Sequence, residues 1–349
     1  MTARPEPFEE VWILDDLGPF EQWSARVART ALTLFKPVGT VRFWPFQQTE
    51  SMGDAVFYGR NPRYGADISY YLAHPARRPG ELIITNAGGK VVRTYKGLHK
   101  GKAAVMTPRS PGAAAAVKGR VPWVPGQAGL HRIYWNLRAQ GPVRWSSAPQ
   151  YNRGPHNGAL LPPGTYTATL KIGGATASQT FTVVNDPAST GTLAAMTERY
   201  HVTEAVLREI SQIDVALNRL HALAVQLTGL RSAVKGLSEQ SAADAAIGRL
   251  ARARHAILMQ LTSHAGSSEA TLRVPDRIHE KLLALEGLLW GSDEPVDAAT
   301  LHEQAVYGRE YRSAIAAYDQ FLGTSVAGFN RTMSGYGLTG VVAGKTLTP

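Results

Sequence analysis

Two acidic residues stand side by side near the start of the chain, in the segment VWILDDLGPFEQW at residues 11–23. Glycoside hydrolysis needs two carboxyl groups about 5 to 9.5 Å apart, flanking a sugar cleft. Neighbouring residues of a strand point to opposite faces, so Asp15 and Asp16 are poorly placed to act as such a pair. We interpret both as polar residues at a strand end and turn, with Gly18 and Pro19 as the exit.

Other short motifs do not complete a catalytic or cofactor site. HEKLL at residue 279 and HEQAV at residue 302 begin like the zinc motif H-E-x-x-H but lack the second histidine, and we expect both on solvated helix faces. GYGLTG at 335–340 matches a dinucleotide fingerprint, yet no helix can follow it before the chain ends. The chain also has no cysteine and no G-x-S-x-G elbow. We therefore expect no catalytic residue, no cofactor and no metal in this chain.

The positive charge of the chain is concentrated in one segment. The net charge is +10, yet no Asp or Glu occurs between Glu81 and Asp186, where 13 Lys and Arg residues lie. One interpretation is a solvated basic surface, and the other is a binding surface for an anionic glycan or an acidic protein. Nucleic acid is the least favoured partner, because no known binding motif accompanies the charge. The residues assigned to this surface are Lys90, Arg93, Lys96, Lys100, Lys102, Arg109, Lys118, Arg120, Arg132, Arg138 and Arg144.

Aromatic residues in the same segment offer possible stacking surfaces. These are Tyr95, Trp123, Tyr134 and Trp145, whereas Trp135 is expected in the core. Trp135 shares one face of the alternating segment GLHRIYWNLR (129–138) with the apolar Ile133 and Leu137, and that pattern is typical of a half-buried strand.

The elements that would position these residues are strands up to about residue 185. Short β-branched and aromatic runs are separated by glycine turns, with hairpins predicted at Gly88-Gly89 and Gly173-Gly174. The second hairpin places Tyr166, Ala168, Leu170 and Ile172 on one side. This pattern predicts an antiparallel sandwich, and the Gly-, Pro-, Ala- and Lys-rich range 97–128 is expected to be a long loop within it.

The remaining chain is expected to be helical. Val206, Ile210, Ile213, Leu217, Leu220, Ala224 and Leu227 form one stripe of a long helix that begins near Thr192. Three further amphipathic segments follow: one through Ile247–Leu261, one from Pro275 through Leu289, and one from SDEPVD to Met333. Four such helices joined by short loops predict an antiparallel bundle. No apolar stretch is long enough to span a membrane, and residues 1–10 are not a signal peptide.

Several segments, taken in order, resemble one known family. VWILDDLGPFEQW is similar to the last propeller strand and exit segment of bacterial sortilin-like, BNR-repeat β-propeller proteins, which are often labelled glycosyl hydrolases. NPRYGADISYYL, IITNAGGKVVRTY, GLHRIYWNLR and LPPGTYTATLKIGG resemble strands of the immunoglobulin-like domain that follows, akin to the domain of the flagellar hook-capping protein. SDEPVDAATLHEQ and FNRTMSGYGL resemble the terminal helical region. The chain departs from the family at Asn136, where Asp is usual, and lacks the propeller blades with their Asp-box turns.

The resemblance implies a multidomain chain, β and then α. The expected parts are a propeller-exit strand and linker at 1–48, an immunoglobulin-like β-sandwich at 49–187 with a basic loop at 97–128, a four-helix bundle at 188–338, and a flexible tail at 339–349. The implied function is that of a non-catalytic accessory or interaction module that supports or docks to a propeller encoded upstream. The compartment is left open by the chain itself, and it is periplasmic or secreted if the chain is joined to an exported propeller.

An exposed strand would provide the docking mechanism, because such a strand can add to an open sheet edge. The residues assigned to it are Val11, Trp12, Ile13, Leu14, Asp15 and Asp16. Two alternatives stay open at this point: a glycoside hydrolase component that acts on polysaccharide, and a polyanion-binding protein that uses the basic sandwich.

Overall fold

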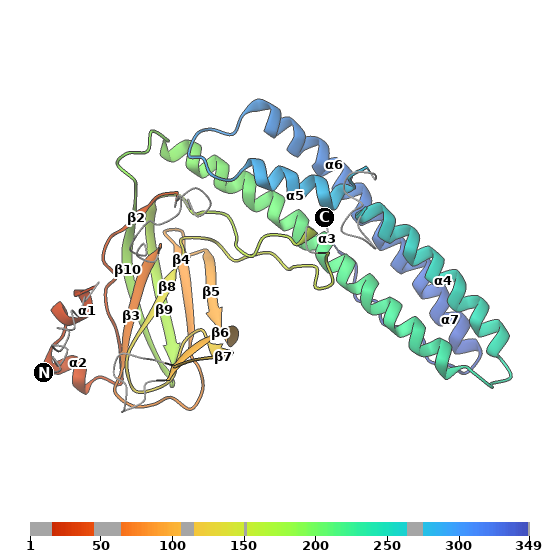
Figure 1. Cartoon of the computed structure of the whole chain (residues 1–349), viewed down its shortest axis with the longest axis horizontal. Coiled ribbons are helices and arrows are strands. Elements are labelled where there is room, and N and C mark those ends of the chain that lie inside the picture. The colour runs from red at the N-terminus through yellow and green to blue at the C-terminus, as the bar shows by residue number, and fades with distance from the viewer. Residues whose placement is uncertain (1–15, 45–63, 106–114, 150–151, 264–274, 348–349) are drawn as a thin grey trace, which may run out of the picture. The chain divides into compact units, whose positions relative to one another are not determined.

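The computed structural model describes residues 16–44, 64–105, 115–149, 152–263 and 275–347, with the backbone alone at 99–105 and 115–122. Strands occupy the N-terminal part and helices follow, as expected (Figure 1). The chain divides into two compact units. The β unit comprises Met1–Leu137 and Pro163–Pro187, and the helical unit comprises Arg138–Pro162 and Ala188–Pro349. Residues 138–162, expected within the sandwich range, therefore belong with the helices.

The β unit contains two sheets and a separate strand pair. The strands are β1 Leu32–Leu34, β2 Thr40–Arg42, β3 Ala66–Leu72, β4 Glu81–Asn86, β5 Val91–Lys96, β6 Leu98–Val105, β7 Ala115–Pro122, β8 Gly129–Trp135, β9 Gly164–Ile172 and β10 Ala175–Asn185. One sheet has the order β1-β3-β8, the other has the order β2-β10-β9-β4-β5, and β6 pairs with β7. Every pairing is antiparallel except that of β2 with β10.

Alternation along the strands produces the core of the β unit. Tyr166, Ala168, Leu170 and Ile172 of β9 are all buried, as the pattern predicts. Trp135 is fully buried and its ring meets the ring of Tyr166 edge-on, with centroids 5.1 Å apart, which confirms its expected place in the core. Such an aromatic pair stabilises a core beyond the area that it buries.

Glycines form the turns of both predicted hairpins. Gly173 and Gly174 join β9 to β10 with φ of 61° and 84°, a conformation that few other residues adopt. In the β4–β5 hairpin only Gly89 has positive φ, at 76°.

Two expectations for the β unit are wrong. The range 97–128 is not one long loop, because β6 and β7 pair over eight positions within it. Their small and β-branched residues tolerate the extended conformation, and the pairing satisfies backbone groups that a loop would leave to water. The described part of the 1–48 range is also more than a linker, since β1 pairs with β3 and β2 pairs with β10, so each sheet includes a strand from it. Two short helices, α1 Gly18–Glu21 and α2 Ala25–Arg29, precede β1.

The helical unit contains the elements α3 Leu193–Ala233, α4 Gln240–Leu261, α5 Ile278–Leu288, α6 Ala298–Phe321, a π-helical turn η3 Leu322–Val326, and α7 Ala327–Gly335. The α6, η3 and α7 segments form one helical run, as the sequence predicts (Figure 1). Helix α3 begins after Thr192, whose hydroxyl accepts a hydrogen bond from the Ala195 amide. That N-cap supplies a partner for an otherwise unpaired amide and defines the start of the helix.

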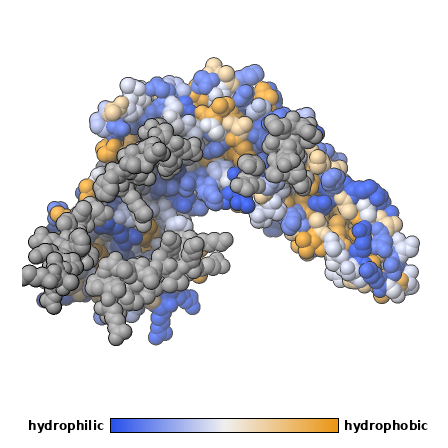
Figure 2. All heavy atoms as spheres, viewed as in Figure 1, coloured by the Kyte–Doolittle hydropathy of each residue, from blue (hydrophilic) through white to orange (hydrophobic). Residues whose placement is uncertain are grey.

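The predicted apolar stripes face the interior of the helical unit. On α3 all the predicted stripe residues are buried except the half-buried Ala224. Figure 2 shows the hydrophobic residues on the visible face of the helices in several separate groups, between hydrophilic ones. Within the described ranges, none of the helices combines the length and the apolar character that crossing a membrane requires.

The C-terminal segment, expected to be flexible, is held by side chains through residue 347. The Asn330 side chain donates to the Val341 carbonyl at 2.9 Å and accepts from the Val341 amide at 2.8 Å. Gln226 forms the same pair of bonds with Val342. Each of these side-chain amides both donates to and accepts from the backbone of one residue. The two amides therefore hold the segment in place as the backbone of a neighbouring strand would.

Candidate functional site

The residues assigned to the basic surface do not form one surface. Arg138 and Arg144 belong to the helical unit. Arg138 is only 8% exposed; it donates to the Gly158 carbonyl, and its guanidinium carbon lies 4.5 Å from the centre of the Trp290 ring. Arg144 donates to the Gly154 carbonyl at 2.9 Å. Both arginines therefore stabilise the 138–162 segment and are not available as an open anion surface.

In the β unit, three of the assigned cations have partners. Lys96 pairs with Glu81 at 3.3 Å, and Arg132 pairs with Asp67 at 2.9 Å. Arg93 lies over the ring of Tyr95, with 5.0 Å between the guanidinium carbon and the ring centre. The two ion pairs reduce the charge available to a ligand at Lys96 and Arg132.

The other assigned cations are either exposed or described through the backbone alone. Lys90 is exposed in the β4–β5 turn. In the β6–β7 pair, Lys100 lies opposite Arg120 and Lys102 opposite Lys118, so strand alternation places these four positions on one face of the pair. Arg109 lies outside the described residues.

The aromatic residues expected as stacking surfaces are less accessible than predicted. Tyr95 is 3% exposed and Trp145 is 8% exposed. Trp123 and Tyr134 are half-buried. The first two therefore contribute to packing and cannot stack on a ligand.

The predicted docking strand lies almost entirely outside the described residues, which begin at Asp16. The Asp16 carboxylate accepts a hydrogen bond from the Gly18 amide at 2.8 Å, and its other oxygen lies 3.8 Å from Arg132. Asp16 thus organises the turn into α1. After this turn, three large apolar side chains are exposed within seven residues: Leu17 at 53%, Phe20 at 54% and Trp23 at 43%.

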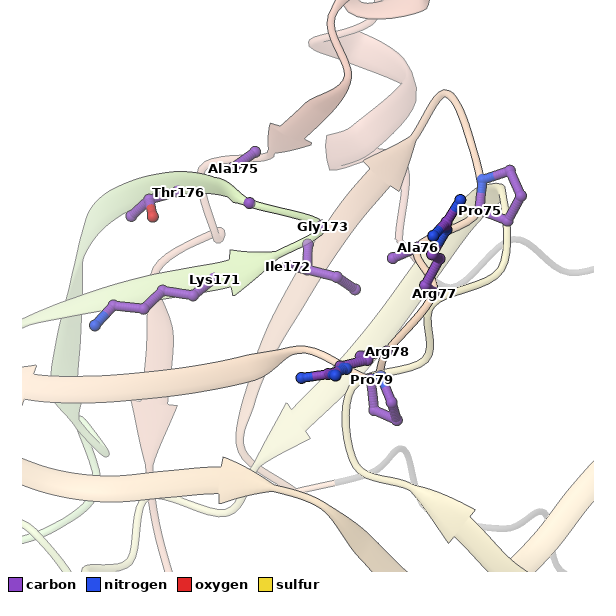
Figure 3. Close-up of a pocket in the computed structure, with 11 residues that line it drawn as sticks. Pro75, Ala76, Arg77, Arg78, Pro79, Lys171, Ile172, Gly173, Ala175 and Thr176 are labelled. Atoms are coloured by element: carbon purple, nitrogen blue, oxygen red, sulfur yellow. The ribbon is translucent and has the colours of Figure 1, made fainter.

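An open hollow of about 630 Å³ lies at one end of the β unit (Figure 3). Figure 3 shows the β9–β10 turn on one side of it and the segment 75–79 on the other. Its lining includes three cations, Arg77, Arg78 and Lys171, all exposed, and no acidic residue. Arg77 and Arg78 were not among the predicted residues because they precede Glu81, outside the acid-free segment.

Backbone contacts fix the walls of the hollow. The Ala76 amide donates to the Gly126 carbonyl at 2.7 Å, and the Gly80 amide donates to the Val124 carbonyl at 3.1 Å. A Cβ atom added to Gly173 would lie 3.6 Å from the Cβ of Ala76, so the turn and the loop lie close together. The cations therefore project from backbone that is held by hydrogen bonds. The 75–79 loop also has a proline at each end, and proline restricts the backbone.

The helical unit contains a buried ionic cluster that sequence analysis also missed. His279 at the start of α5 donates from Nε2 to Asp214 Oδ1 of α3 at 2.8 Å, and both side chains are fully buried. His279 Nδ1 lies 3.6 Å from Glu280 Oε1. The Trp145 ring meets the His279 ring edge-on, with centroids 5.8 Å apart. HEKLL was expected on a solvated face, and that expectation is wrong for His279 and Glu280.

Glu280 joins three parts of the helical unit. Its Oε1 accepts from Asn152 Nδ2 at 2.7 Å and from the Thr262 hydroxyl at 2.6 Å. Its Oε2 accepts from the amides of Ser263 at 3.1 Å and Arg277 at 3.0 Å. One carboxylate therefore connects the 138–162 segment, the end of α4 and the start of α5.

The charges of the cluster stabilise one another. Burial lowers the pKa of His279, but hydrogen bonds and charge interactions with Asp214 and Glu280 outweigh it and raise the pKa to about 9. For Glu280, burial raises the pKa, but the neighbouring His279 and hydrogen bonds from Thr262 and Asn152 hold it well below its usual range. At neutral pH the histidine is a cation between carboxylates, as expected for a paired buried charge.

The cluster has the residue types of a catalytic site but not the access. His279 and Asp214 have no exposed surface, and Glu280 uses both oxygens in hydrogen bonds. A general acid or base must reach the proton that it transfers. The arrangement therefore serves to hold the helices together. In the described part of the chain, no three His, Asp or Glu side chains are grouped so that they could hold a metal ion.

Comparisons of the chain with protein-family models, with curated proteins and with solved structures find no match.

Proposed function

We propose that this chain is a non-catalytic interaction module, the C-terminal portion of a sortilin-like BNR-repeat propeller protein. In this proposal the two sheets of the β unit form an immunoglobulin-like sandwich, and the four helical segments form an antiparallel bundle. The β unit holds the binding surfaces in this proposal. Two features favour interaction over catalysis: the buried carboxylates are inaccessible, and the hollow at the end of the β unit has no acidic residue in its lining.

The exposed apolar group formed by Leu17, Phe20 and Trp23 carries this proposal. Its three residues lie within VWILDDLGPFEQW, the segment that resembles a propeller strand and exit segment. The Trp23 ring packs on Tyr71, with centroids 4.9 Å apart, and stacks on Phe35 at 6.2 Å. The group is therefore anchored to the β unit, and exposed apolar residues gathered at one place are typical of a protein interface.

A double substitution tests the docking. The double substitution Leu17→Ser with Phe20→Ser should abolish binding to a separately expressed propeller encoded upstream. Each substitution removes an exposed apolar side chain that would contact the propeller. Trp23 is left in place since it packs on the fold. The matched control is Val91→Ser, which changes a 54% exposed residue of β5. Unchanged binding by the double variant would contradict the proposal.

A second candidate function, polyanion binding, is favoured by the three cations of the hollow. Surface cations with no carboxylate among them attract anionic chains, and such binding weakens as salt screens the charges. Affinity for a heparin-like polymer should therefore fall steeply between low and physiological salt. Binding that is absent at low salt, or that does not change with salt, would reject this function.

A further inference from the structure

The hollow continues into a hydroxyl-rich face of the five-stranded sheet. The exposed side of β9 and β10 displays seven hydroxyls, those of Thr165, Thr167, Thr169, Thr176, Ser178, Thr180 and Thr182. Thr167 and Thr180 lie opposite each other with their hydroxyls 3.1 Å apart, and Thr169 and Ser178 do the same at 2.9 Å. The cross-strand pairs form a ladder, since partners in register share one face of a sheet.

Cations stand at the end of this ladder that adjoins the hollow. Thr176 lies opposite Lys171, which lines the hollow with Arg77 and Arg78. The same row of the sheet continues through Glu81 to Lys96. Glu81 forms an ion pair with Lys96. The positive charge of the three cations of the hollow therefore exceeds the neighbouring negative charge.

We propose that this face binds an acidic polysaccharide, with a carboxylate or sulfate group in the hollow and neighbouring sugars along the hydroxyl ladder. Arginine presents a planar fork of donors that matches an oxyanion. Each hydroxyl provides one donor and two acceptor positions, so the paired hydroxyls keep capacity for a sugar. The inference rests on polyanion binding and adds the ligand class and the residues.

The position of the face favours a glycan over other polyanions. Single-stranded nucleic acid binds on aromatic platforms, and the described outer positions of β9 and β10 carry no aromatic residue. An extended peptide adds to a free sheet edge, whereas the hydroxyl ladder lies on the face of the sheet, and β9 is paired with β10 on one side and with β4 on the other. The row of hydroxyls ends at a group of cations. This arrangement is complementary to an acidic polysaccharide, whose chain carries both hydroxyls and acidic groups.

The test measures binding of the full chain to four probes by isothermal titration calorimetry. The probes are polygalacturonate, neutral dextran, a DNA duplex and inorganic sulfate. Arg77→Ala with Arg78→Ala should weaken polygalacturonate binding by about tenfold or more, because charge-assisted hydrogen bonds are lost. Thr167→Val with Thr180→Val should weaken it by roughly threefold or more, because valine keeps the strand shape but forms no hydrogen bond. Dextran should not bind.

The control substitution is Lys235→Ala, which removes an exposed cation of the helical unit, outside the proposed site, and should leave the affinity unchanged. DNA binding as tight as polygalacturonate binding would overturn the glycan assignment. Sulfate that competes fully would show that the hollow takes a free oxyanion and would also overturn it. Polygalacturonate binding that survives the double arginine substitution would refute this site while leaving polyanion binding intact. No binding to any polyanion would reject both.

Discussion

His279 should make the helical unit less stable as the pH rises from about 6 to about 9.5. Its pKa in the folded chain is raised to about 9 from an ordinary value of 6.5, because the interactions with Asp214 and Glu280 outweigh the opposing effect of burial. A raised pKa means that the folded state binds the proton more tightly. The stabilisation is therefore complete below the unfolded pKa of 6.5 and is lost as the pH passes through the folded pKa of about 9.

The size of the effect follows from the two pKa values. A difference of this size corresponds to about 3 kcal/mol of unfolding free energy. An independent argument agrees in order of magnitude, since removing one partner of a buried ion pair costs about 3 to 5 kcal/mol. Solvent screening does not reduce these figures much, because the Asp214 and His279 side chains are fully buried.

Urea unfolding followed by the helical circular dichroism signal measures the effect. The wild type should lose about 3 kcal/mol more than His279→Gln over this pH range, because the variant lacks the imidazole whose pKa differs between the folded and unfolded states. The His279→Gln protein should be the less stable of the two at pH 6. His255→Gln is the matched control, since His255 is exposed on α4. Parallel pH profiles for wild type and His279→Gln would refute the reasoning.

Two further substitutions test the packing of each unit. Asn152→Leu removes a 2.7 Å bond to Glu280 and should lower the unfolding free energy by about 1.5 to 3 kcal/mol, measured by urea unfolding at neutral pH; an unchanged midpoint would show that the bond contributes nothing. Gly65→Ala should lower the melting temperature, since Gly65 has φ of 123° and its added Cβ would meet the Trp135 carbonyl. Gly88→Ala, in a turn with negative φ and space, is the control, and equal melting temperatures for both variants would contradict the argument.

The local patterns that predicted secondary structure depend on residues close together in sequence. The alternation through Tyr166 and Ile172 and the stripe from Val206 to Leu227 each reflect one face of one element, so they can be identified without the fold. The strands β6 and β7 were missed because their lysines and glycines resemble loop composition. Only the pairing of two segments satisfies their backbone groups, and that pairing is not visible in either segment alone.

The candidate sites depend on residues far apart in sequence, and for this reason the sequence misled. HEKLL in isolation has the polar start of a solvated helix. His279 faces the interior because it pairs there with Asp214 of α3, which lies 65 positions away in the sequence. The partners of Glu280 come from two further segments, at Asn152 and Thr262. The charge of a basic segment is similarly a poor guide to a basic surface: Arg138 lies within it and is buried, whereas Arg77 lies outside it and lines the hollow. A binding face is therefore better sought where several cations share one cavity whose lining contains no carboxylate, as in the hollow beside the hydroxyl ladder.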